Sequence, residues 1–333
     1  MTESTPGGKG TNDGGRAPRP VTLVAAIALV GLVVPVVLGV RLAVGPGPLT
    51  QDPPAPETVQ EVSLGSTPSE PLPVAPRKVQ AVTIAPQAVQ TVRRVYDRHS
   101  YDLVAIAGGE TAVPPIFVRT LPEDWQAIER AEVRKQLFVK TVLPLVLKAN
   151  AEIRTDRRRL LDLAEQANGD PANLDDGARY WLKQLASRYR VDGIDFTKLK
   201  TRVDIIPPSL ALAQAANESG WGTSRFARQG NALFGQWTWE AGQGIKPKEM
   251  QKGKGNYAVR KFNSLGDSVS AYMRNLNTHT AYAPMRERRH KLRLAGEPLD
   301  GAALAGGLVK YSQRGQAYIE EIRGMISYND FQR

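Results

Sequence analysis

The chain contains no cysteine and only three histidines. The absence of cysteine excludes disulfides, thiolate nucleophiles and thiolate metal sites. The histidines, His99, His279 and His290, have none of the short spacings that are typical of zinc ligands. The sequence therefore predicts a protein without a metal centre, and no motif in it predicts another cofactor.

Acidic residues are the scarcer charged class: 33 Asp and Glu oppose 44 Lys and Arg, for a net charge of +11. An excess of this size fits three kinds of partner, namely nucleic acid, an anionic membrane surface, or an anionic polymer such as peptidoglycan. A basic surface without any specific partner fits equally well. Charge alone does not choose among these, so the placement of the chain relative to a membrane becomes important.

Charged residues are missing from the run VTLVAAIALVGLVVPVVLGV, which Arg41 closes. A helix of about 20 such residues spans the roughly 30 Å core of a bilayer, so we expect residues 21–41 to be a transmembrane helix. The alternative is a cleaved signal peptide, whose apolar region is shorter, about 7–15 residues. Basic residues within the polar tail 1–20 predict that this tail stays in the cytoplasm. The rest of the chain would then lie outside the cytoplasmic membrane, which argues against nucleic acid as a partner.

Two further segments precede the region that carries the chemistry. Residues 42–92 are rich in proline and lack apolar periodicity, so they are expected to form an extended linker. Residues 93–204 have helical periodicity, and a helix is expected over 177–189. Pro144 lies inside a longer helical run and is expected to kink or break it.

Residues 205–330 have a different composition and are expected to form the catalytic domain. An alanine-rich helix is predicted over 209–219, preceded by prolines and followed by glycines. The stretch 230–262 is rich in Gly, Trp and Lys, which indicates loops with short strands. Helical periodicity returns over 267–276 and 317–326.

Glu218 is the candidate for acid chemistry. It closes the alanine-rich helix and shares one face of it with Ala211, Gln214 and Ala215. Small side chains on that face would let a substrate approach the carboxyl group, and Trp221 follows three residues later. A carboxyl group beside apolar surface loses hydration, which raises its pKa and keeps it protonated as a general acid. The alternative interpretation is an ordinary glutamate near a helix end.

Three stretches, in order along the chain, carry a family resemblance: ALAQAANESGWGTSRFARQGNALFGQW, AYMRNLNTHTAY and KYSQRGQAYIEEIRGMI. They closely resemble the glucosaminidase domain of glycoside hydrolase family 73, above all its Bax-type branch, which is related to the flagellar peptidoglycan hydrolase domain. The resemblance implies a mainly α, lysozyme-like α+β fold with a small β-hairpin lobe. It also implies hydrolysis of the β-1,4 bond after N-acetylglucosamine in peptidoglycan. The acid of the family's ESGWG motif corresponds to Glu218.

The resemblance also implies further catalytic groups. The family's second carboxylate lies on a β-hairpin and corresponds to Glu249, with Glu240 as the competing candidate. It would activate the attacking water in an inverting mechanism, whereas the substrate's own acetamido group would replace it in an assisted one. The family's tyrosine corresponds to Tyr311, although Ser-Gln-Arg follows it here in place of the usual small-Thr-Asp. Tyr318, seven residues later, is a candidate glycan contact or a core residue.

Trp237 and Trp239 are the predicted sugar-stacking residues, because side chains two apart in a strand share one face and broad aromatic rings bind the apolar faces of sugars. Both could instead belong to the core. The remaining predicted glycan contacts come from the family motifs and are Trp221, Asn231, Phe234, Gly235, Tyr282 and Tyr318.

The leading hypothesis is a single-pass protein of the bacterial inner membrane whose catalytic domain cuts peptidoglycan in the periplasm or elsewhere outside the cytoplasmic membrane. A muramidase or lytic transglycosylase is the alternative enzyme, but NALFGQW after ESGWG favours a glucosaminidase. A non-catalytic peptidoglycan-binding module is the alternative from another class. The sequence assigns no envelope protein partner.

Overall fold

The computed structural model describes residues 80–248 and 257–332. The predicted cytoplasmic tail, the transmembrane helix 21–41 and most of the linker lie outside these ranges. Within them, no helix is both long enough and apolar enough to cross a bilayer.

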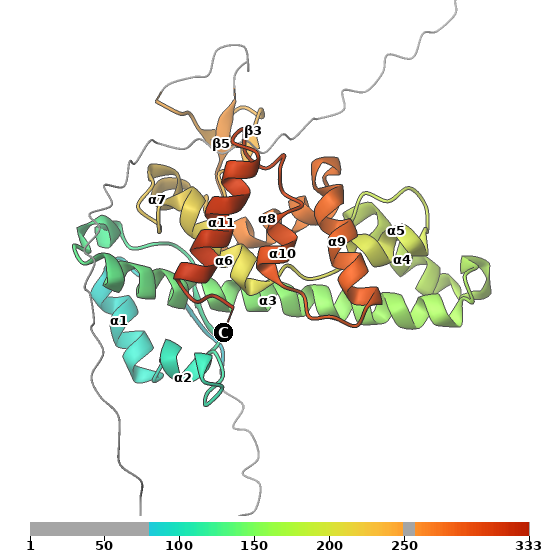
Figure 1. The fold of residues 1–333 in the computed structure, drawn as a ribbon, viewed down its shortest axis with the longest axis horizontal. Helices are drawn as coiled ribbons and strands as arrows, with labels where there is room; N and C mark the ends of the chain where they lie inside the picture. The colour runs from blue at the N-terminus through green and yellow to red at the C-terminus, as the bar shows by residue number, and fades with distance from the viewer. Residues whose placement is uncertain (1–79, 249–256, 333) are drawn as a thin grey trace, which may run out of the picture.

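The described chain is mainly helical and contains two small sheets, so the prediction of a mainly α chain is confirmed at this level (Figure 1). Three short 3₁₀ turns, at Glu123–Ala127, Pro171–Asn173 and Thr280–Tyr282, join longer elements. In chain order the elements are β1 (Val82–Ile84), α1 (Val89–Arg98), α2 (Leu103–Ala107), β2 (Ile116–Val118), α3 (Ala131–Gln166), α4 (Asp176–Arg188), α5 (Phe196–Arg202), α6 (Pro208–Ser219), α7 (Arg225–Gly230), β3 (Trp237–Thr238), β4 (Gly244–Ile245), β5 (Ala258–Arg260), α8 (Leu265–Thr278), α9 (Ala283–Leu294), α10 (Gly301–Ala305) and α11 (Gln316–Tyr328).

The 36-residue helix α3 runs along the whole molecule and continues through Pro144, so the break expected there does not occur (Figure 1). A proline inside a helix removes one backbone hydrogen bond and costs about 3 kcal/mol. Val142, Leu145 and Val146 surround Pro144 and are buried in the core. Burying side chains of this size stabilises by about 1.5–3 kcal/mol each, which offsets the cost of the proline.

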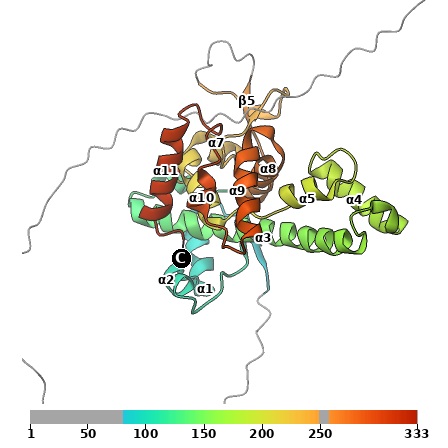
Figure 2. The ribbon, with the colours of Figure 1, turned by 45° about the vertical axis from the view of Figure 1, so that its right-hand side comes forward.

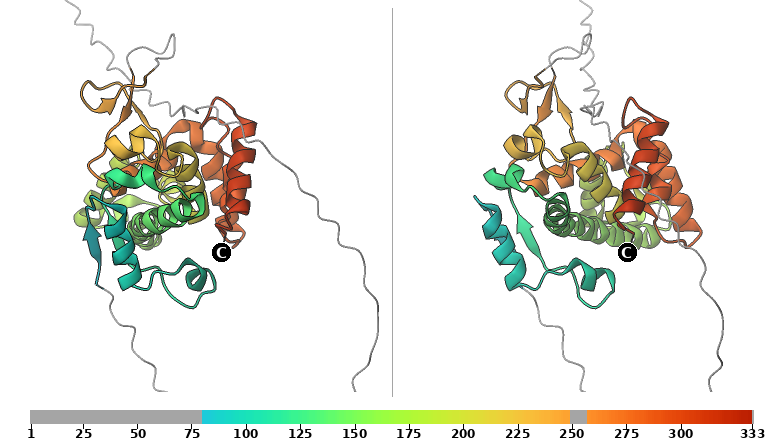
Figure 3. Two further views of the ribbon diagram at one scale, coloured as in Figure 1. Left: turned by 90° about the vertical axis from the view of Figure 1, so that its left-hand side faces the viewer. Right: turned by 60° about the vertical axis from the view of Figure 1, so that its left-hand side comes forward.

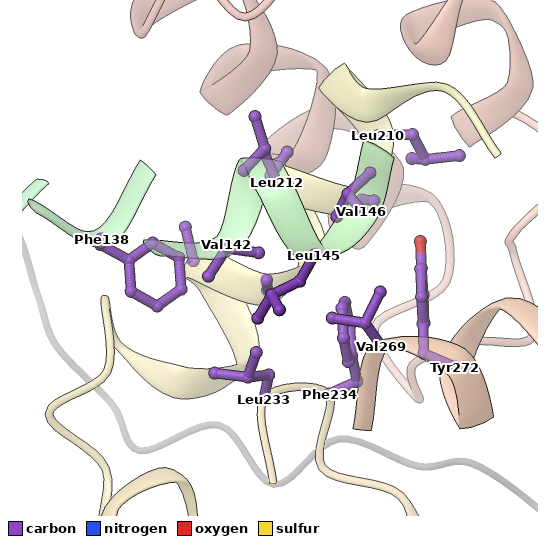
Figure 4. Close-up of a cluster of buried hydrophobic side chains, with 14 of the residues drawn as sticks. Phe138, Val142, Leu145, Val146, Leu210, Leu212, Leu233, Phe234, Val269 and Tyr272 are labelled. Carbon is purple, nitrogen blue, oxygen red and sulfur yellow. The ribbon is translucent and has the colours of Figure 1, made fainter. Parts of the chain in front are cut away.

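One hydrophobic core joins the first half of α3 to the helices that follow residue 205. Figure 4 shows Leu145 and Val146 of α3 in one cluster with Leu210 and Leu212 of α6 and with Val269 and Tyr272 of α8. The same cluster extends from Val89 to Ile326. Much of the region 93–204 is therefore packed into the core of the predicted catalytic domain.

The second half of α3 carries a separate, smaller cluster. Leu160 and Leu163 pack there against residues of α4 and α5, including Leu182 and Leu199. This lobe lies at one end of α3, away from α10 and α11 (Figure 2). The expected helix over 177–189 corresponds to α4.

The two sheets lie on different sides of α3, as Figure 3 shows. Strands β1 and β2 are parallel, with Val82 opposite Ile116, and they lie beside α1 and α2. Regular structure therefore begins before residue 92, where the linker was expected to end, and β2 is a strand within the region expected to be helical. The second sheet is antiparallel in the order β3–β5–β4 and forms the small β lobe that was expected near the acid.

Helix α6 is the central element of the core. Proline occupies its first position and Gly220 ends it in the left-handed conformation, with φ +57°. Every residue from Ser209 to Ala216 is buried. Because five of those residues are alanine or serine, neighbouring helices can approach α6 closely on all sides. The helix therefore delivers its last turn, which includes Glu218, to a fixed position.

Candidate active site

Glu218 lies in the last turn of α6, and the main chain turns sharply directly after it. The Ser219 hydroxyl donates to Ala215 O at 2.6 Å and accepts from Gly222 N at 2.9 Å. Gly220 and Trp221 both have positive φ values, of +57° and +58°. These contacts fix the end of the helix and with it the backbone that carries Glu218.

Four buried tyrosines lie near this carboxyl group. Tyr311 and Tyr318 stack at 5.3 Å between ring centroids with 9° between planes, and Tyr282 lies 5.7 Å from Tyr311. Tyr272 stacks on Phe234 at 3.8 Å. The charge of Glu218 influences all four hydroxyl groups. The predicted residues Tyr282, Tyr311 and Tyr318 are thus brought together around Glu218, although each is at most 1% exposed.

Burial raises the pKa of Glu218 from its ordinary value of 4.5 to about 8. The Tyr318 hydroxyl, as a hydrogen-bond donor, and Arg314 both lower the pKa, and Glu321 raises it. Among the described residues, Glu218 Oε1 has no hydrogen-bond partner, and it is shielded from solvent. The carboxyl group is therefore largely neutral at pH 7 and holds a proton that it can donate.

Two hydrogen bonds join α8, α6 and α11 beside Glu218. The Tyr272 hydroxyl donates to Gln214 Oε1 at 2.7 Å, and Gln214 Nε2 donates to the Tyr318 hydroxyl at 2.8 Å. The Tyr318 hydroxyl in turn lowers the pKa of the Glu218 carboxyl group. The sequence placed Gln214 on the face of Glu218 but gave it no role, and it gave none to Tyr272. The sequence could have pointed to Gln214, because it is a polar residue one helical turn before the candidate acid on a helix that is otherwise rich in alanine.

The Phe234–Gly235 motif supplies backbone rather than ring surface to the site. Phe234 is 2% exposed, and its carbonyl oxygen accepts the Tyr311 hydroxyl at 3.3 Å. Gly235 has φ +59°, and a Cβ atom built on it would lie 3.8 Å from Glu218 Oε2. The motif therefore places main chain directly against the carboxyl group.

The rings of Trp237 and Trp239 meet edge to face on the β lobe, with 6.2 Å between ring centroids. Trp237 is 3% exposed and stacks on Tyr257 at 4.2 Å, whereas Trp239 is 39% exposed. They contribute to a hollow of about 140 Å³, which Glu240 also lines. Of the two predicted sugar platforms, only Trp239 presents a ring to solvent.

The second carboxylate is not placed by the described residues, because Glu249 lies outside them. Glu240 is exposed on the β lobe. The structure adds Glu321 of α11, which the sequence did not single out and whose charge acts on Glu218. Glu321 forms an ion pair with Arg314, and Arg314 lies over the Tyr318 ring at 5.6 Å.

Trp221 and Asn231 contact other parts of the molecule. The Trp221 ring packs edge-on against Phe138 at 5.7 Å, and Lys135 lies over it at 5.2 Å. Trp221 and Lys135 line a groove of about 520 Å³ beside α2 and α3, whose lining does not include Glu218. Asn231 ends α7 with φ +52° and donates to Phe262 O at 3.0 Å, so it holds the β lobe to α7.

No group of three or more His, Asp or Glu side chains that could hold a metal ion occurs in residues 80–248 and 257–332. The chemistry that the site can perform with its own groups is proton transfer from a half-buried, neutral carboxyl group.

Comparison with known proteins agrees with this site. The model of the glucosaminidase family, described as mannosyl-glycoprotein endo-beta-N-acetylglucosaminidase, matches residues 194–331, which include Glu218 and all four tyrosines. The protein bax of Escherichia coli (strain K12) is 38% identical over 206 residues, which cover 60% of this chain and 70% of that protein. No solved structure matches the chain at a significant level.

The chain belongs to the glucosaminidase family. The resemblance noted in the sequence is thereby confirmed. Membership supports a glycoside hydrolase of the peptidoglycan-hydrolase kind, and the glucosaminidase family implies peptidoglycan as the substrate. The match begins before residue 205 and so includes all of α5, which contributes Leu199 to the smaller lobe.

Proposed function

We propose that the chain is an endo-β-N-acetylglucosaminidase that cleaves the β-1,4 bond after N-acetylglucosamine in peptidoglycan strands, with Glu218 as the general acid. The observation that carries this proposal is the pKa of about 8 at Glu218, in the motif that the family model matches. A neutral carboxyl group can protonate the glycosidic oxygen as the bond breaks, and general acid catalysis of this kind contributes about 10²–10⁴-fold to the rate.

The helical core around α6 with the β lobe beside it supports a lysozyme-like fold for this domain. In such an arrangement the glycan strand passes Glu218 and continues over the β lobe, where Trp239 is available for stacking on a sugar face. The net charge of +11 favours an anionic polymer whose stem peptides carry carboxylates.

We assign the second carboxylate to Glu249, as the base that activates water. Its competitor Glu240 lies on the β lobe and is exposed. Hydrolysis that is lost in Glu249→Gln but retained in Glu240→Gln supports this assignment. Hydrolysis that both variants retain supports participation of the substrate's acetamido group instead.

Residues 21–41 are proposed to anchor the protein in the inner membrane, with the catalytic domain in the periplasm. The support is the uncharged run and the basic residues before it. Fractionation of bacterial cells, with protease added to spheroplasts, tests this arrangement. Digestion of the domain in spheroplasts and its protection in intact cells are expected.

The reaction is tested by incubating the purified full-length chain with peptidoglycan and identifying the new reducing ends after borohydride reduction. We expect N-acetylglucosaminitol from the native chain and none from Glu218→Gln, whose fold is checked by circular dichroism. Muramitol or anhydromuramic ends that depend on Glu218 would identify a muramidase or a lytic transglycosylase. Binding to peptidoglycan without new ends from either protein would identify a binding module.

A further inference from the structure

Three elements far apart in the sequence meet in the hydrogen-bond chain described above. Tyr272 comes from α8, Gln214 from α6 and Tyr318 from α11, and their separations in sequence are 58 and 104 residues. All three side chains are at most 1% exposed. Buried polar groups that satisfy one another in this way have few alternative arrangements, because water cannot replace a lost partner.

The chemistry of the groups gives this chain a single direction. The Gln214 oxygen can only accept and its nitrogen can only donate, whereas each tyrosine hydroxyl has one proton. The Tyr272 proton goes to Gln214 Oε1, so Gln214 Nε2 faces Tyr318. Since the Tyr318 oxygen accepts that bond, its own proton is left for another acceptor, and Glu218 is a carboxyl group on which this hydroxyl acts.

A flipped amide at Gln214 would reverse this direction. Its oxygen would then face Tyr318 and compete with Glu218 for the Tyr318 proton. In residues 80–248 and 257–332 the Tyr272 hydroxyl has no other hydrogen-bond partner, so its proton would lose its acceptor. Leaving such a buried group unpaired costs about 1–3 kcal/mol, which is enough to hold the amide in one orientation.

We propose that Gln214 and Tyr272 are positioning residues that keep the Tyr318 proton directed at the Glu218 carboxyl group. The proposal rests on the proposed role of Glu218 as the acid. A donor aimed at the carboxylate stabilises the anion that remains after the proton has gone to the leaving oxygen. Without it, burial alone would hold the proton too tightly for efficient transfer.

Ring stacking keeps the hydroxyl groups of this chain in place. Phe234 lies flat on Tyr272, with 6° between the ring planes, and Tyr311 lies flat on Tyr318. Neither tyrosine of the chain can rotate without displacing its neighbour, so the donor is in position before substrate binds. The Phe234 and Tyr311 motif residues thus support the acid indirectly.

Other ionisable groups also face Glu218 and stay the same in the variants proposed below. From α11 and the loop before it come Glu321 and Arg314, which pair with each other. Tyr282 and Tyr311 face it from two further segments. Because Glu218 also acts on Tyr272 directly, the double variant described below is needed to show that the effect passes through Gln214 and Tyr318.

Titration of Glu218 itself tests the proposal without any need for hydrolysis. The chain is labelled with ¹³C at the glutamate side-chain carboxyl carbons, and the Glu218 resonance is the one absent from Glu218→Gln. We expect Tyr318→Phe to raise the titration midpoint by about one pH unit, since a hydrogen bond to a charged group contributes about 1.5–3 kcal/mol. Tyr272→Phe is expected to raise it as well, although Tyr272 does not touch Glu218.

Two further variants distinguish an effect of hydrogen-bond direction from an effect of side-chain packing in the core. Tyr272→Phe combined with Tyr318→Phe should raise the midpoint no further than Tyr318→Phe alone, because both act through one bond. Tyr96→Phe removes a buried hydroxyl bonded to Thr141 in the same core and should leave the midpoint unchanged.

A midpoint that moves in Tyr318→Phe but not in Tyr272→Phe would overturn the proposal, because Tyr318 would then act alone. An unchanged midpoint in all variants would overturn it too. Failure of the proposed function appears separately, as absence of new sugar ends from the native chain. The shifts remain measurable in that case.

Discussion

Gly235 brings the main chain against the Glu218 carboxyl group, because a Cβ atom added to this glycine would lie 3.8 Å from Glu218 Oε2. Its φ of +59° adds a second constraint, since left-handed backbone costs a residue with a Cβ about 1–2 kcal/mol. We expect Gly235→Ala to lower the free energy of unfolding by about that amount and to reduce hydrolysis. Chemical denaturation and release of sugar ends measure the two effects.

Gly324 provides the matched control for this substitution. It lies within α11, has no heavy atom within 4 Å of an added Cβ, and does not have a positive φ. Gly324→Ala should therefore stabilise the protein by about 0.5–1 kcal/mol and leave hydrolysis unchanged. Equal effects of the two substitutions would show that Gly235 has no special place beside the acid.

Hydrolysis should depend on pH through the acid form of Glu218. The carboxyl group is protonated below its pKa of about 8. We therefore expect kcat/KM to stay constant as the pH rises toward 8 and to fall above it. A pH–rate profile on soluble glycan fragments measures this limb. A loss of activity centred near pH 5 would contradict the assignment, because it would mean that the acid is hydrated like an ordinary glutamate.

The same group should also make stability depend on pH. Its pKa in the folded protein is raised from 4.5, so between 4.5 and about 8 the folded state binds more protons than the unfolded state. The free energy of unfolding contributed by Glu218 is therefore full below 4.5 and is lost as the pH rises toward 8. Glu218→Gln lacks this loss, so its free energy of unfolding should rise relative to that of the native chain between pH 5 and pH 9. Urea denaturation of both proteins at the two pH values measures this change. If the free energies of unfolding of both proteins changed equally with pH, the pKa of Glu218 would not be raised by folding.

Asp204 is the buried anion of an arginine cluster that joins α3 to α9. Arg293 contacts both of its oxygens, at 2.9 and 3.0 Å, and Arg157 lies 3.6 Å away. Removing one partner of a buried ion pair destabilises by about 3–5 kcal/mol, so Asp204→Asn should lower the urea midpoint strongly. Asp176→Asn, in an exposed pair with Arg179, should change the stability by less than about 0.5 kcal/mol. Similar effects of both substitutions would contradict a structural role for the cluster.

The two tryptophans of the β lobe should behave differently. Trp237→Ala removes a ring buried against Tyr257 and should destabilise by about 3–5 kcal/mol. Trp239→Ala should leave stability nearly unchanged. It should weaken binding to peptidoglycan roughly two- to tenfold, because stacking of one ring contributes about 0.5–1.5 kcal/mol. Thermal melts and sedimentation with peptidoglycan, both in a Glu218→Gln background, separate the two. Unchanged binding by Trp239→Ala would remove this ring from the glycan path.

Helices whose ends carry local signals could be predicted from the sequence. The expected helix over 209–219 matches α6 because a proline begins it and Gly220 ends it, and both signals act within one turn. Glu218 could be singled out for the same reason, since its place at that helix end and its motif are local. Tertiary contacts, in contrast, decided the elements that the sequence did not anticipate. Strand β2 exists through pairing with β1, and α3 passes Pro144 because its flanking residues are buried.

The surroundings of Glu218 could be predicted only in part. The family motifs pointed to Tyr282, Tyr311 and Tyr318. Their position near Glu218, however, results from the tertiary fold, because no local pattern in their segments predicts that they come together. Gln214 lies on the correct face of α6, yet its direction of donation depends on a hydroxyl 58 residues away. No periodicity or spacing in one sequence encodes that orientation.

The length of α3 has a consequence for how a long polymer would meet this protein. At about 1.5 Å per residue its 36 residues measure about 54 Å, and one unbroken helix belongs to both hydrophobic clusters. The smaller lobe of α4 and α5 therefore cannot swing on a hinge, because any swing would require α3 itself to bend. A glycan strand that touched both this lobe and Glu218 would be bound at two points, and the helix would keep the distance between those points constant.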